Sequence, residues 1–362
     1  MINNNVSDLR KQIDAIDNKL LELLNRRMAI AIDINKEKKK TSAPVYYPSR
    51  EAFIVNRLVR QNKGQLKNEF IKHIFKEIFS ASRASVTPPK IAYLGPEGAW
   101  AHQAALLEFG NSSPLMPAKN ISEIFNEVEY SNCDFGVVPI ENSMEGTVPQ
   151  TLDRFIDSNL LIAREIFVPI TYVLAVKKRI SLKDIRKVYS HPQAIAQCRR
   201  WIREKLPNAM TVDTDSTSQA AKIVQHSGSS VAIVSELAAR LYKLKILASR
   251  LEENPNNVTR FVVIGKIMPD RTDNDKTSII FAVKHRSGAL YAALKPFSDY
   301  NVNLTKIESR PLKKKAWEYL FFVDIDGHIE DQKIKKAIAA LKLHTVFFKF
   351  LGSYPKTKQE NL

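Results

Sequence analysis

Arg27 interrupts an apolar repeat, which makes it the first candidate for chemistry in this chain. Apolar residues recur at alternating steps of four and three, and position 27 holds an arginine where the repeat needs an apolar residue. The repeat consists of Leu9, Ile13, Ile16, Leu20, Leu23, Ile30 and Ile34. A guanidinium on an apolar face is costly unless an anion pairs with it. Arg10 beside the start of the repeat and Lys38 beyond its end add two more cations, which predicts a buried site for a small dianion. From the repeat alone, two alternatives stay open: Arg27 extends to solvent, or it pairs with a carboxylate of another helix.

Polar residues gather at the ends of β-rich runs in the middle of the chain. Glu141, Asn142 and Ser143 follow an apolar run, at the carboxyl end of a strand, where open α/β sheets bind ligands. Thr259, Arg260 and Phe261 enter another run after a polar loop at 252–257. The simpler alternatives are a helix cap for Asn142 and Ser143 and a strand start for Thr259.

Two helix starts in the same region also carry polar groups. Ser216, Thr217 and Ser218 precede a helix and can present hydroxyls and backbone N–H groups to a carboxylate. Gln193 follows His191 at the start of another helix; Gln193 is the better ligand candidate, and a structural role suits His191.

The cations of the first segment need a long helix to carry them. Residues 6–40 contain no Gly or Pro, and Ser7 is a candidate N-cap, so we predict one helix about 50 Å long. A helix of that length with a sustained repeat needs a partner, which predicts a second subunit. Further helices are expected after Pro48, with Ser49 as cap, and over 67–85.

The rest of the chain changes its pattern twice. From Lys90, strands alternate with helices over about 180 residues, which predicts an α/β domain, and the run 160–176 is predicted as two strands broken at Pro169 that cross between two lobes. After a polar linker at 269–275, the order strand, helix, strand, strand, helix, strand predicts a ferredoxin-like α+β unit.

Composition excludes several classes of protein. The 362 residues predict two or three domains. A net charge of +17 suits nucleic-acid binding or attraction of small anions, but the basic clusters at 38–40, 313–315 and 333–336 are scattered, so we expect no nucleic-acid partner. No run approaches the roughly 18 apolar residues of a membrane span. The N-terminus shows no leader pattern, and the two cysteines, Cys133 and Cys198, do not form a CxxC pair. Together these features predict a reducing, cytoplasmic location. No histidine spacing predicts a metal site.

Three groups of motifs occur in one order along the chain. The first is LRKQIDAIDNKLLELLNRR with Lys38 and PSRE; the second is GPEGAWAHQAA, VVPIENSMEGTV, YSHPQAIAQC, STSQAA and NNVTRFVVIG; the third is GAL and ESRP. With these motifs the chain resembles the bifunctional chorismate mutase–prephenate dehydratases of phenylalanine biosynthesis. The resemblance implies an all-helical mutase domain (1–88), a two-lobed, periplasmic-binding-protein-like dehydratase domain (89–268) and an ACT regulatory domain (276–362). It implies a homodimer or tetramer and no cofactor.

The resemblance also implies roles in the mutase reaction. Arg27, and Arg10 from the partner subunit, would bind the two carboxylates of chorismate, and Lys38 would donate to its ether oxygen. Glu51 and Ser82 would hold the ring hydroxyl and its surroundings, with Arg50 ordering the site. Two positions depart from the family pattern. Tyr47 stands where an acid is common, although its backbone N–H can serve, and Val86 stands where Gln or Glu donates to the ether oxygen.

For the dehydratase, the resemblance places the hydroxyl of Thr259 closest to the chemistry, while Arg260 clamps a carboxylate or holds the loop. The other implied prephenate contacts are Glu141, Asn142, Ser143, Gln193, Ser216, Thr217, Ser218 and Phe261. Phenylalanine, the end product, would bind between two ACT domains and inhibit the enzyme. Its implied contacts are Gly288, Ala289, Leu290, Asn303, Leu304, Glu308, Ser309, Arg310 and Pro311.

Two alternatives remain. A dehydratase with a weakened or vestigial mutase module would follow from Val86, which cannot donate a hydrogen bond. A ligand-sensing transcription regulator would need a helix-turn-helix, and the uninterrupted helix over 6–40 argues against it.

Overall fold

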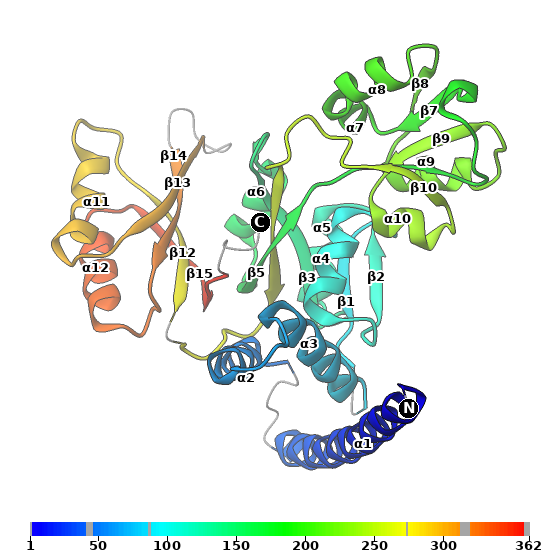
Figure 1. Ribbon diagram of the computed structural model, residues 1–362. Helices are drawn as coiled ribbons and strands as arrows, with labels where there is room; N and C mark the ends of the chain where they lie inside the picture. The colour runs from blue at the N-terminus through cyan, green and yellow to red at the C-terminus, as the bar shows by residue number, and fades with distance from the viewer. Residues whose placement is uncertain (1, 41–45, 86–87, 273, 312–318, 358–362) are drawn as a thin grey trace.

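The computed structural model describes residues 2–40, 46–85, 88–272, 274–311 and 319–357, which form three units (Figure 1). The first is helical: α1 (Ile2–Lys40), α2 (Pro48–Gln61) and α3 (Asn68–Ala84). The prediction of one long first helix is confirmed, but α1 begins at Ile2, so the expected cap Ser7 lies inside it. Ser49 was also wrong as a cap, because Pro48 occupies the first position of α2 and Tyr47 precedes it as N-cap.

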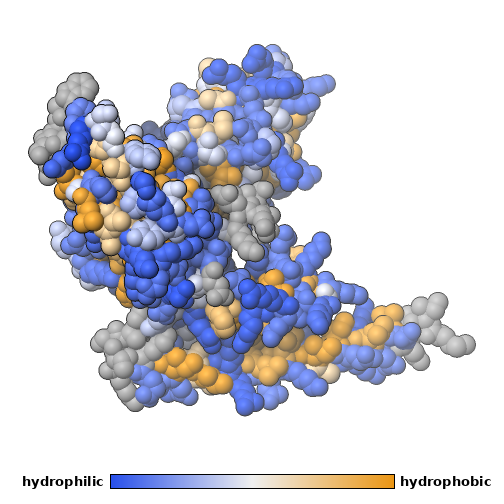
Figure 2. Space-filling view, turned by 90° about the vertical axis from the view of Figure 1, so that its left-hand side faces the viewer, coloured by the Kyte–Doolittle hydropathy of each residue, from blue (hydrophilic) through white to orange (hydrophobic). Residues whose placement is uncertain are grey.

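The apolar repeat of α1 is open to solvent within one chain. Its seven apolar members, from Leu9 to Ile34, are 51–60% exposed, far more than the interior of a folded domain allows. Figure 2 shows apolar side chains running along the lower edge of the molecule, where Figure 1 places α1. Contiguous apolar surface of this kind indicates an interaction site.

The second unit has two lobes, and a mixed sheet forms the centre of lobe one. Its strand order is β2-β1-β3-β11-β5, with the short β4 beside β3. β11 runs antiparallel to both β3 and β5. The elements of lobe one are β1 (Ile91–Leu94), α4 (Trp100–Phe109), β2 (Leu115–Ala118), α5 (Ile121–Glu129), β3 (Phe135–Asn142), β4 (Gly146–Thr147), α6 (Pro149–Asp157), β5 (Leu161–Pro169) and β11 (Val258–Gly265).

Lobe two contains a separate sheet of order β10-β6-β9-β7-β8. β5 ends at Pro169 in one sheet and β6 begins at Val173 in the other, so the predicted crossover is confirmed. The helix expected over 195–205 is instead two helices that meet at Cys198. The elements of lobe two are β6 (Val173–Val176), β7 (Lys187–Ser190), α7 (Pro192–Gln197), α8 (Arg199–Lys205), β8 (Met210–Asp213), α9 (Thr217–Val224), β9 (Ser230–Val234), α10 (Glu236–Leu241) and β10 (Lys245–Ser249), with a 3-10 turn at Leu182–Asp184.

The third unit has the predicted ferredoxin-like order. Its elements are β12 (Asp275–Ala282), α11 (Ala289–Asp299), β13 (Leu304–Pro311), β14 (Tyr319–Asp326), α12 (Gln332–Leu343) and β15 (Phe347–Pro355). The antiparallel sheet has the order β13-β14-β12-β15, with α11 and α12 on the side away from lobe one (Figure 1). No described helix has the length and apolarity that a bilayer crossing requires.

The other face of this C-terminal sheet packs directly on lobe one. Ile280, Phe322 and Leu351 share one apolar cluster with Ile162 and Ile264 of lobe one. β15 approaches β5 so closely at Gly352 that a Cβ there would lie 2.4 Å from the carbonyl oxygen of Ile162. The C-terminal unit and lobe one therefore share one hydrophobic core.

Candidate functional sites

Arg27 lies against α3, half buried between an aromatic ring and a hydroxyl. Its Nη1 donates to Ser82 Oγ over 2.8 Å, and its guanidinium carbon lies 5.4 Å from the centre of the Phe79 ring. Burial lowers the pKa of Arg27, and the charge of Glu51 opposes that shift. The repeat of α1 thus brings a partly desolvated cation to one spot on α3, and within the described residues only one of its N–H donors makes a hydrogen bond, to Ser82.

Glu51 lies in the first turn of α2 and forms an ion pair with Arg83 of α3. Burial raises the pKa of Glu51, while the Arg83 guanidinium acts in the opposite direction. Sequence reasoning missed Arg83, because its position carries no spacing that points to Glu51. Arg27, Ser82 and Glu51 are therefore brought together as a cation, a hydroxyl and a carboxylate.

The structure places the other predicted residues of this site less completely. Arg10 is exposed on α1, and Arg50 is exposed with its guanidinium over the ring of Phe53. Lys38 lies in the last turn of α1, but its side chain is outside the described part of the structure, as is Val86.

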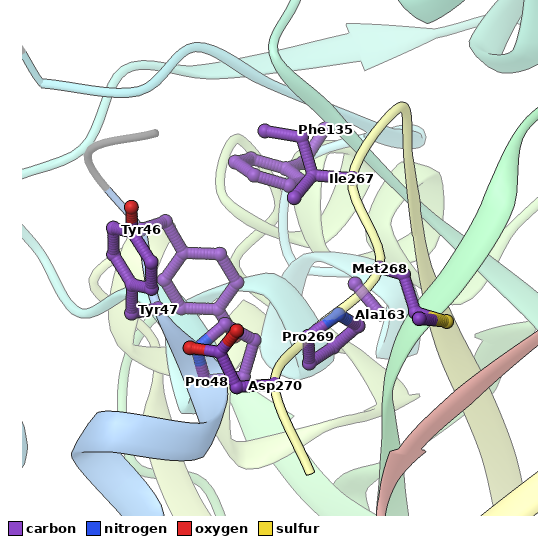
Figure 3. Close-up of a pocket in the computed structure, with 9 residues that line it drawn as sticks. All are labelled: Tyr46, Tyr47, Pro48, Phe135, Ala163, Ile267, Met268, Pro269 and Asp270. Atoms are coloured by element: carbon purple, nitrogen blue, oxygen red, sulfur yellow. The ribbon is translucent and has the colours of Figure 1, made fainter. Parts of the chain in front are cut away.

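Tyr47 lines a cavity of about 170 Å³ where the segment before α2 meets the linker to the C-terminal unit (Figure 3). The rings of Tyr46 and Phe135 form further walls, and Pro269 and Asp270 lie across from them. Burial raises the pKa of Tyr47, and Asp270 adds to that shift. The Tyr47 side chain therefore belongs to a junction between units.

The second group of polar residues lies where β3 and β11 pair in lobe one. Thr259 is 9% exposed and stands opposite Asn142 in the antiparallel register. Asn142 Nδ2 donates to Thr259 Oγ1 and to Asn257 Oδ1, each over 2.8 Å. Since the amide supplies a donor, the hydroxyl of Thr259 can donate its own proton elsewhere.

The turn after β3 is fixed by the same residues. Asn142 Oδ1 accepts from the backbone N–H groups of Met144 and Glu145 over 2.9 and 3.1 Å. Ser143 N–H donates to the carbonyl of Val258 over 2.9 Å, and Val258 N–H donates back to Ser143 Oγ over 3.0 Å. Asn142 and Ser143 thus order a turn tied to β11 and are not the caps of the next helix, α6, whose N-cap is Val148.

Lobe two touches this group through α7. Gln193 Nε2 donates to the carboxylate of Glu145, and Asn257 Nδ2 donates to Gln197 Oε1 over 3.0 Å. His191 caps α7 by accepting from Gln193 N–H, as its structural interpretation predicted. Asn257 was missed as a site residue, although it lies in the polar loop that directly precedes β11, and it is 2% exposed.

The serine segment at the start of α9 faces a different part of lobe one. Ser216 caps α9 by accepting from Gln219 N–H over 3.1 Å, and Thr217 is the first helical residue. Ser218 is 1% exposed, and its Oγ has no hydrogen-bond partner in the described chain. A Cβ on Gly98 would lie 3.1 Å from that oxygen. Among the described residues, no hydrogen bond joins these side chains to Thr259.

Arg260 points to the opposite side of the sheet from Thr259. It is buried, donates to Asp324 Oδ2 over 2.6 Å and to Tyr354 Oη over 2.9 Å, and lies 3.1 Å from Glu165 Oε2. Burial alone would lower the pKa of Arg260, but Asp324 above all raises it well above its ordinary value. These contacts hold the guanidinium at the C-terminal unit.

Two neighbours of Arg260 also differ from the expected substrate contacts. Glu141, its register partner, forms an ion pair of 2.8 Å with Lys306 of β13. Phe261 is 2% exposed inside the core that both lobes share. The pleat explains the placement of Arg260, because consecutive residues of a strand point to opposite faces, so Thr259 and Arg260 cannot both face one ligand. Phe261 shares the face of Thr259, but its side chain is buried in the core.

Three family models match the chain in order: chorismate mutase type II over residues 9–86, prephenate dehydratase over 91–269 and the ACT domain over 277–343. The bifunctional chorismate mutase/prephenate dehydratase of Aquifex aeolicus is 45% identical, over 97% of this chain and 98% of its own length. That of Pseudomonas aeruginosa is 41% identical, over 96% and 97%. The chain belongs to the bifunctional chorismate mutase/prephenate dehydratase family.

A solved relative covers the dehydratase and ACT domains. The prephenate dehydratase of Arthrobacter aurescens, crystallised with L-Phe, is 36% identical and superposes with a TM-score of 0.68, over 74% of this chain and 90% of its own. The helical unit described above is thus the mutase domain, the two-lobed unit the dehydratase domain and the C-terminal unit the ACT domain.

Gly288 marks an open corner of the ACT domain. It has φ +76° as the N-cap of α11, and apart from its own neighbours along the chain no atom of the described residues lies within 4 Å of where its Cβ would be. Ala289 and Leu290 form the start of α11. Asn303 Nδ2 donates to Asp326 Oδ2 over 2.9 Å, and Leu304 begins β13.

The ESRP residues of β13 are divided between the two faces of the ACT sheet. Glu308 accepts from Thr147 Oγ1 over 3.1 Å, and Arg310 forms an ion pair of 3.2 Å with Asp153 of α6. Ser309 and Pro311 alternate with them and are exposed. Half of the motif therefore contacts the dehydratase domain, and the other half is accessible to a ligand or a second subunit.

Proposed function

We propose that this chain converts chorismate to prephenate in its mutase domain and prephenate to phenylpyruvate, carbon dioxide and water in its dehydratase domain, with L-phenylalanine as inhibitor. The observation that carries the proposal is that one chain holds two separate polar groups in the two matched domains: Arg27, Ser82 and Glu51, and Asn142, Asn257 and Thr259. We place the domain boundaries at 1–88, 89–268 and 276–362. Relatives more than 40% identical over the whole chain are bifunctional, so a dehydratase with a vestigial mutase module is not favoured.

The mutase reaction needs orientation and charge stabilisation, since a pericyclic rearrangement uses no nucleophile. We propose that Arg27 binds one carboxylate of chorismate, because its planar fork matches a carboxylate and its donors are only partly used. Glu51 accepts from the ring hydroxyl, with Ser82 beside it. Lys38 donates to the ether oxygen, and the backbone N–H of Tyr47 serves at the position where the family pattern has an acid.

The second carboxylate is assigned to Arg10 of a partner subunit. Arg10 is exposed on α1, on the same helix whose apolar repeat is open to solvent. We propose that two α1 helices cover this repeat in a homodimer, in which each Arg10 approaches the Arg27 site of the other chain; pairing of dimers into tetramers is compatible with this arrangement.

In the dehydratase domain we propose that Thr259 protonates or hydrogen-bonds the departing ring hydroxyl. Asn142 donates to Thr259 Oγ1, which leaves the threonine proton directed at the substrate. As the C–O bond breaks, the carboxylate on the same ring leaves as carbon dioxide, and its electron pair completes the aromatic ring. Ser143 orders the turn, and Gln193 closes lobe two over it through Glu145.

The side-chain carboxylate of prephenate is assigned to the serine segment of lobe two. The N-terminus of α9 carries partial positive charge, and the buried Ser218 Oγ has no described protein partner, so both can serve an anion. Ser216 and Thr217 belong to the same turn. Arg260, Glu141 and Phe261 are assigned to the support of the sheet and of the ACT interface.

Phenylalanine is assigned to the ACT domain. The support is the open corner at Gly288, which lets a charged amino-acid backbone approach the chain, and the likeness to the Arthrobacter aurescens enzyme crystallised with L-Phe. Ala289 and Leu290 begin α11 at this corner. Asn303 and Leu304, at the other end of α11, and the exposed half of the ESRP motif, with Ser309, are assigned to the opposite wall of a pocket between two ACT domains.

The test is to assay the two reactions separately, with chorismate and then prephenate as the substrate. Arg27→Ala should abolish chorismate turnover and leave prephenate turnover within about twofold of wild type, because distant sites behave independently. Thr259→Ala should show the reverse pattern. Disappearance of neither substrate with the wild-type protein would refute the proposal, and parallel loss of both activities in each variant would refute the assignment of separate sites.

A further inference from the structure

Arg83 connects the mutase site to the dehydratase domain. It lies in α3 and is 4% exposed. One nitrogen, Nη1, forms the ion pair with Glu51, and the other, Nη2, donates to the backbone carbonyl of Phe109 in the dehydratase domain over 2.9 Å. Its guanidinium carbon lies 5.5 Å from the centre of the Tyr46 ring. Both ends of the guanidinium fork are thus occupied, one by each domain.

The Arg83 contact is part of a continuous docking face on α3. Glu77 and Ser80 lie six and three residues before Arg83, so all three share one side of the helix. Asn111 Nδ2 donates to Glu77 Oε1 over 3.4 Å, and Ser112 N–H donates to Ser80 Oγ over 3.2 Å. The turn that ends α4 therefore contacts α3 at three positions on one side of the helix, namely Glu77, Ser80 and Arg83.

This docking surface fits closely. Gly110, in the same turn, has φ +74°, and a Cβ on it would lie 2.5 Å from the side chain of Ser80. Beside the turn, Tyr46 donates to Glu108 Oε1 over 2.5 Å and is 2% exposed. The dehydratase domain is therefore seated on α3 and on the segment that begins α2, and both elements carry mutase residues.

We propose that Arg83 is a positioning residue for the mutase reaction: it fixes the Glu51 carboxylate towards the substrate's ring hydroxyl, and the docked dehydratase domain holds Arg83 in place. The proposal rests on the function assigned to Glu51 above. It makes mutase turnover depend on a contact with the domain that catalyses the next reaction.

The charges around Glu51 explain why it needs this support. Burial favours its neutral form, and Glu108 of α4 adds to that effect, whereas Arg83 of α3 and Arg164 of β5 favour the carboxylate. The other charged or titratable groups whose electrostatic interaction reaches it are Arg27 of α1, Lys76 of α3 and Tyr46 before α2. The pKa of Glu51 is already raised, so loss of Arg83 raises it further, and the carboxylate becomes protonated at a higher pH.

The test is Arg83→Gln in the full-length protein, with the rate of chorismate turnover measured from about pH 5 to 9. Near neutral pH, kcat should fall about ten- to a hundredfold, because a misplaced group costs rates of that order. The acid limb of the profile should move upward by about one pH unit, so the deficit shrinks at high pH. A merely structural lesion would lower the rate by one factor at every pH.

Two comparison variants complete the experiment. Arg83→Lys keeps the charge but cannot hold both Glu51 and Phe109, so we expect a loss of kcat with less displacement of the acid limb; this variant also decides the question if Arg83→Gln does not fold. Arg154→Gln removes a part-buried arginine that pairs with Glu129 inside the dehydratase domain and should leave the mutase profile unchanged.

An unchanged mutase pH profile and rate in folded Arg83→Gln or Arg83→Lys would overturn the proposal. If, in the same experiment, Arg27→Ala abolishes chorismate turnover, the mutase function stands and only the role of Arg83 fails. If the wild-type protein does not convert chorismate, both fail together.

Discussion

The two candidate active sites of this chain are built in opposite ways. The dehydratase group is neutral and lies within one chain, where Asn142, Asn257 and Thr259 are joined by hydrogen bonds of 2.8 Å. The mutase group is charged and is open on one side, because α1 carries Arg27 beside an apolar face that nothing in the described chain covers. The hydrogen bonds of the first site all lie within the dehydratase domain, whereas the second site, as proposed above, is completed by groups from outside its own domain.

The difference follows from how each site is assembled. Strand pairing of β3 with β11 sets the dehydratase geometry through backbone hydrogen bonds. The mutase geometry depends on side-chain packing between helices that are long and separate. Consequently, the two activities should respond differently to substitution, subunit contact and effector.

The largest effect is expected at Thr259. Thr259→Ala removes the hydroxyl that Asn142 orients, and dehydratase turnover should fall by about two to four orders of magnitude, the range for loss of a positioned proton donor. Prephenate consumption measures it, with Thr259→Ser as the hydroxyl-retaining control. Wild-type turnover in the alanine variant would remove Thr259 from the mechanism.

The second-largest effect is expected from a charge in the apolar repeat of α1, which should lower mutase turnover but not dehydratase turnover. Leu20→Lys places an ammonium on the proposed subunit contact, so chorismate turnover should fall by about a hundredfold, since the second carboxylate loses its partner. Prephenate turnover should persist. Leu21→Lys, at a neighbouring exposed leucine outside the repeat, is the matched control. Equal losses in both variants, or a monomeric wild type with full mutase activity, would contradict the open-site interpretation.

Phenylalanine should inhibit the dehydratase site by binding to the ACT domain. Coupling of this kind changes affinity by a factor of roughly 5 to 150, and prephenate must weaken phenylalanine binding by the same factor. Gly288→Val should remove the heat of phenylalanine binding and the inhibition, because a branched side chain does not tolerate φ +76°. Gly228→Val, at a glycine with open surroundings in lobe two, is the control. No heat and no inhibition with the wild type at millimolar phenylalanine would show that this domain is not a phenylalanine sensor.

The smallest effect is expected at Val86. Val86→Gln supplies the donor that the family pattern places there, and chorismate turnover should rise severalfold, less than the hundredfold that loss of such a donor typically costs. The measurement is kcat for chorismate, with prephenate turnover as internal control. A lower rate in a folded variant would indicate that the mutase site of this chain works without that donor.

The fold could be predicted where periodicity was strong. The long α1, the crossover at Pro169 and the strand and helix order of the ACT domain follow from apolar spacing and proline positions. The boundaries could not be predicted as closely: Ser7 resembles a cap, but α1 begins at Ile2 and Ser7 lies inside it. The break between α7 and α8 at Cys198 could not be predicted, because no proline or glycine marks it in the sequence.

The sites were predictable as groups of residues, although not in their orientation. Thr259 and Arg260 are neighbours in one motif, and the alternation of a strand already implied that they face different partners. Asn257 could be seen in the sequence as part of a polar loop, but its contact with Gln197 could not be predicted, because it depends on how the two lobes close. Arg83 could not be found from spacing, because its pairing with Glu51 spans 32 positions and two helices.

The placement of Arg260 limits how freely this chain can exchange its parts. Its guanidinium is enclosed by Glu165 of the dehydratase domain and by Asp324 and Tyr354 of the ACT domain, directly behind Thr259. Removing one partner of a buried ion pair leaves a charge without compensation, which is strongly destabilising. An ACT domain grafted from a relative therefore succeeds only if it brings an acid at position 324 and a hydroxyl at 354, so that regulation and catalysis are inherited as one block.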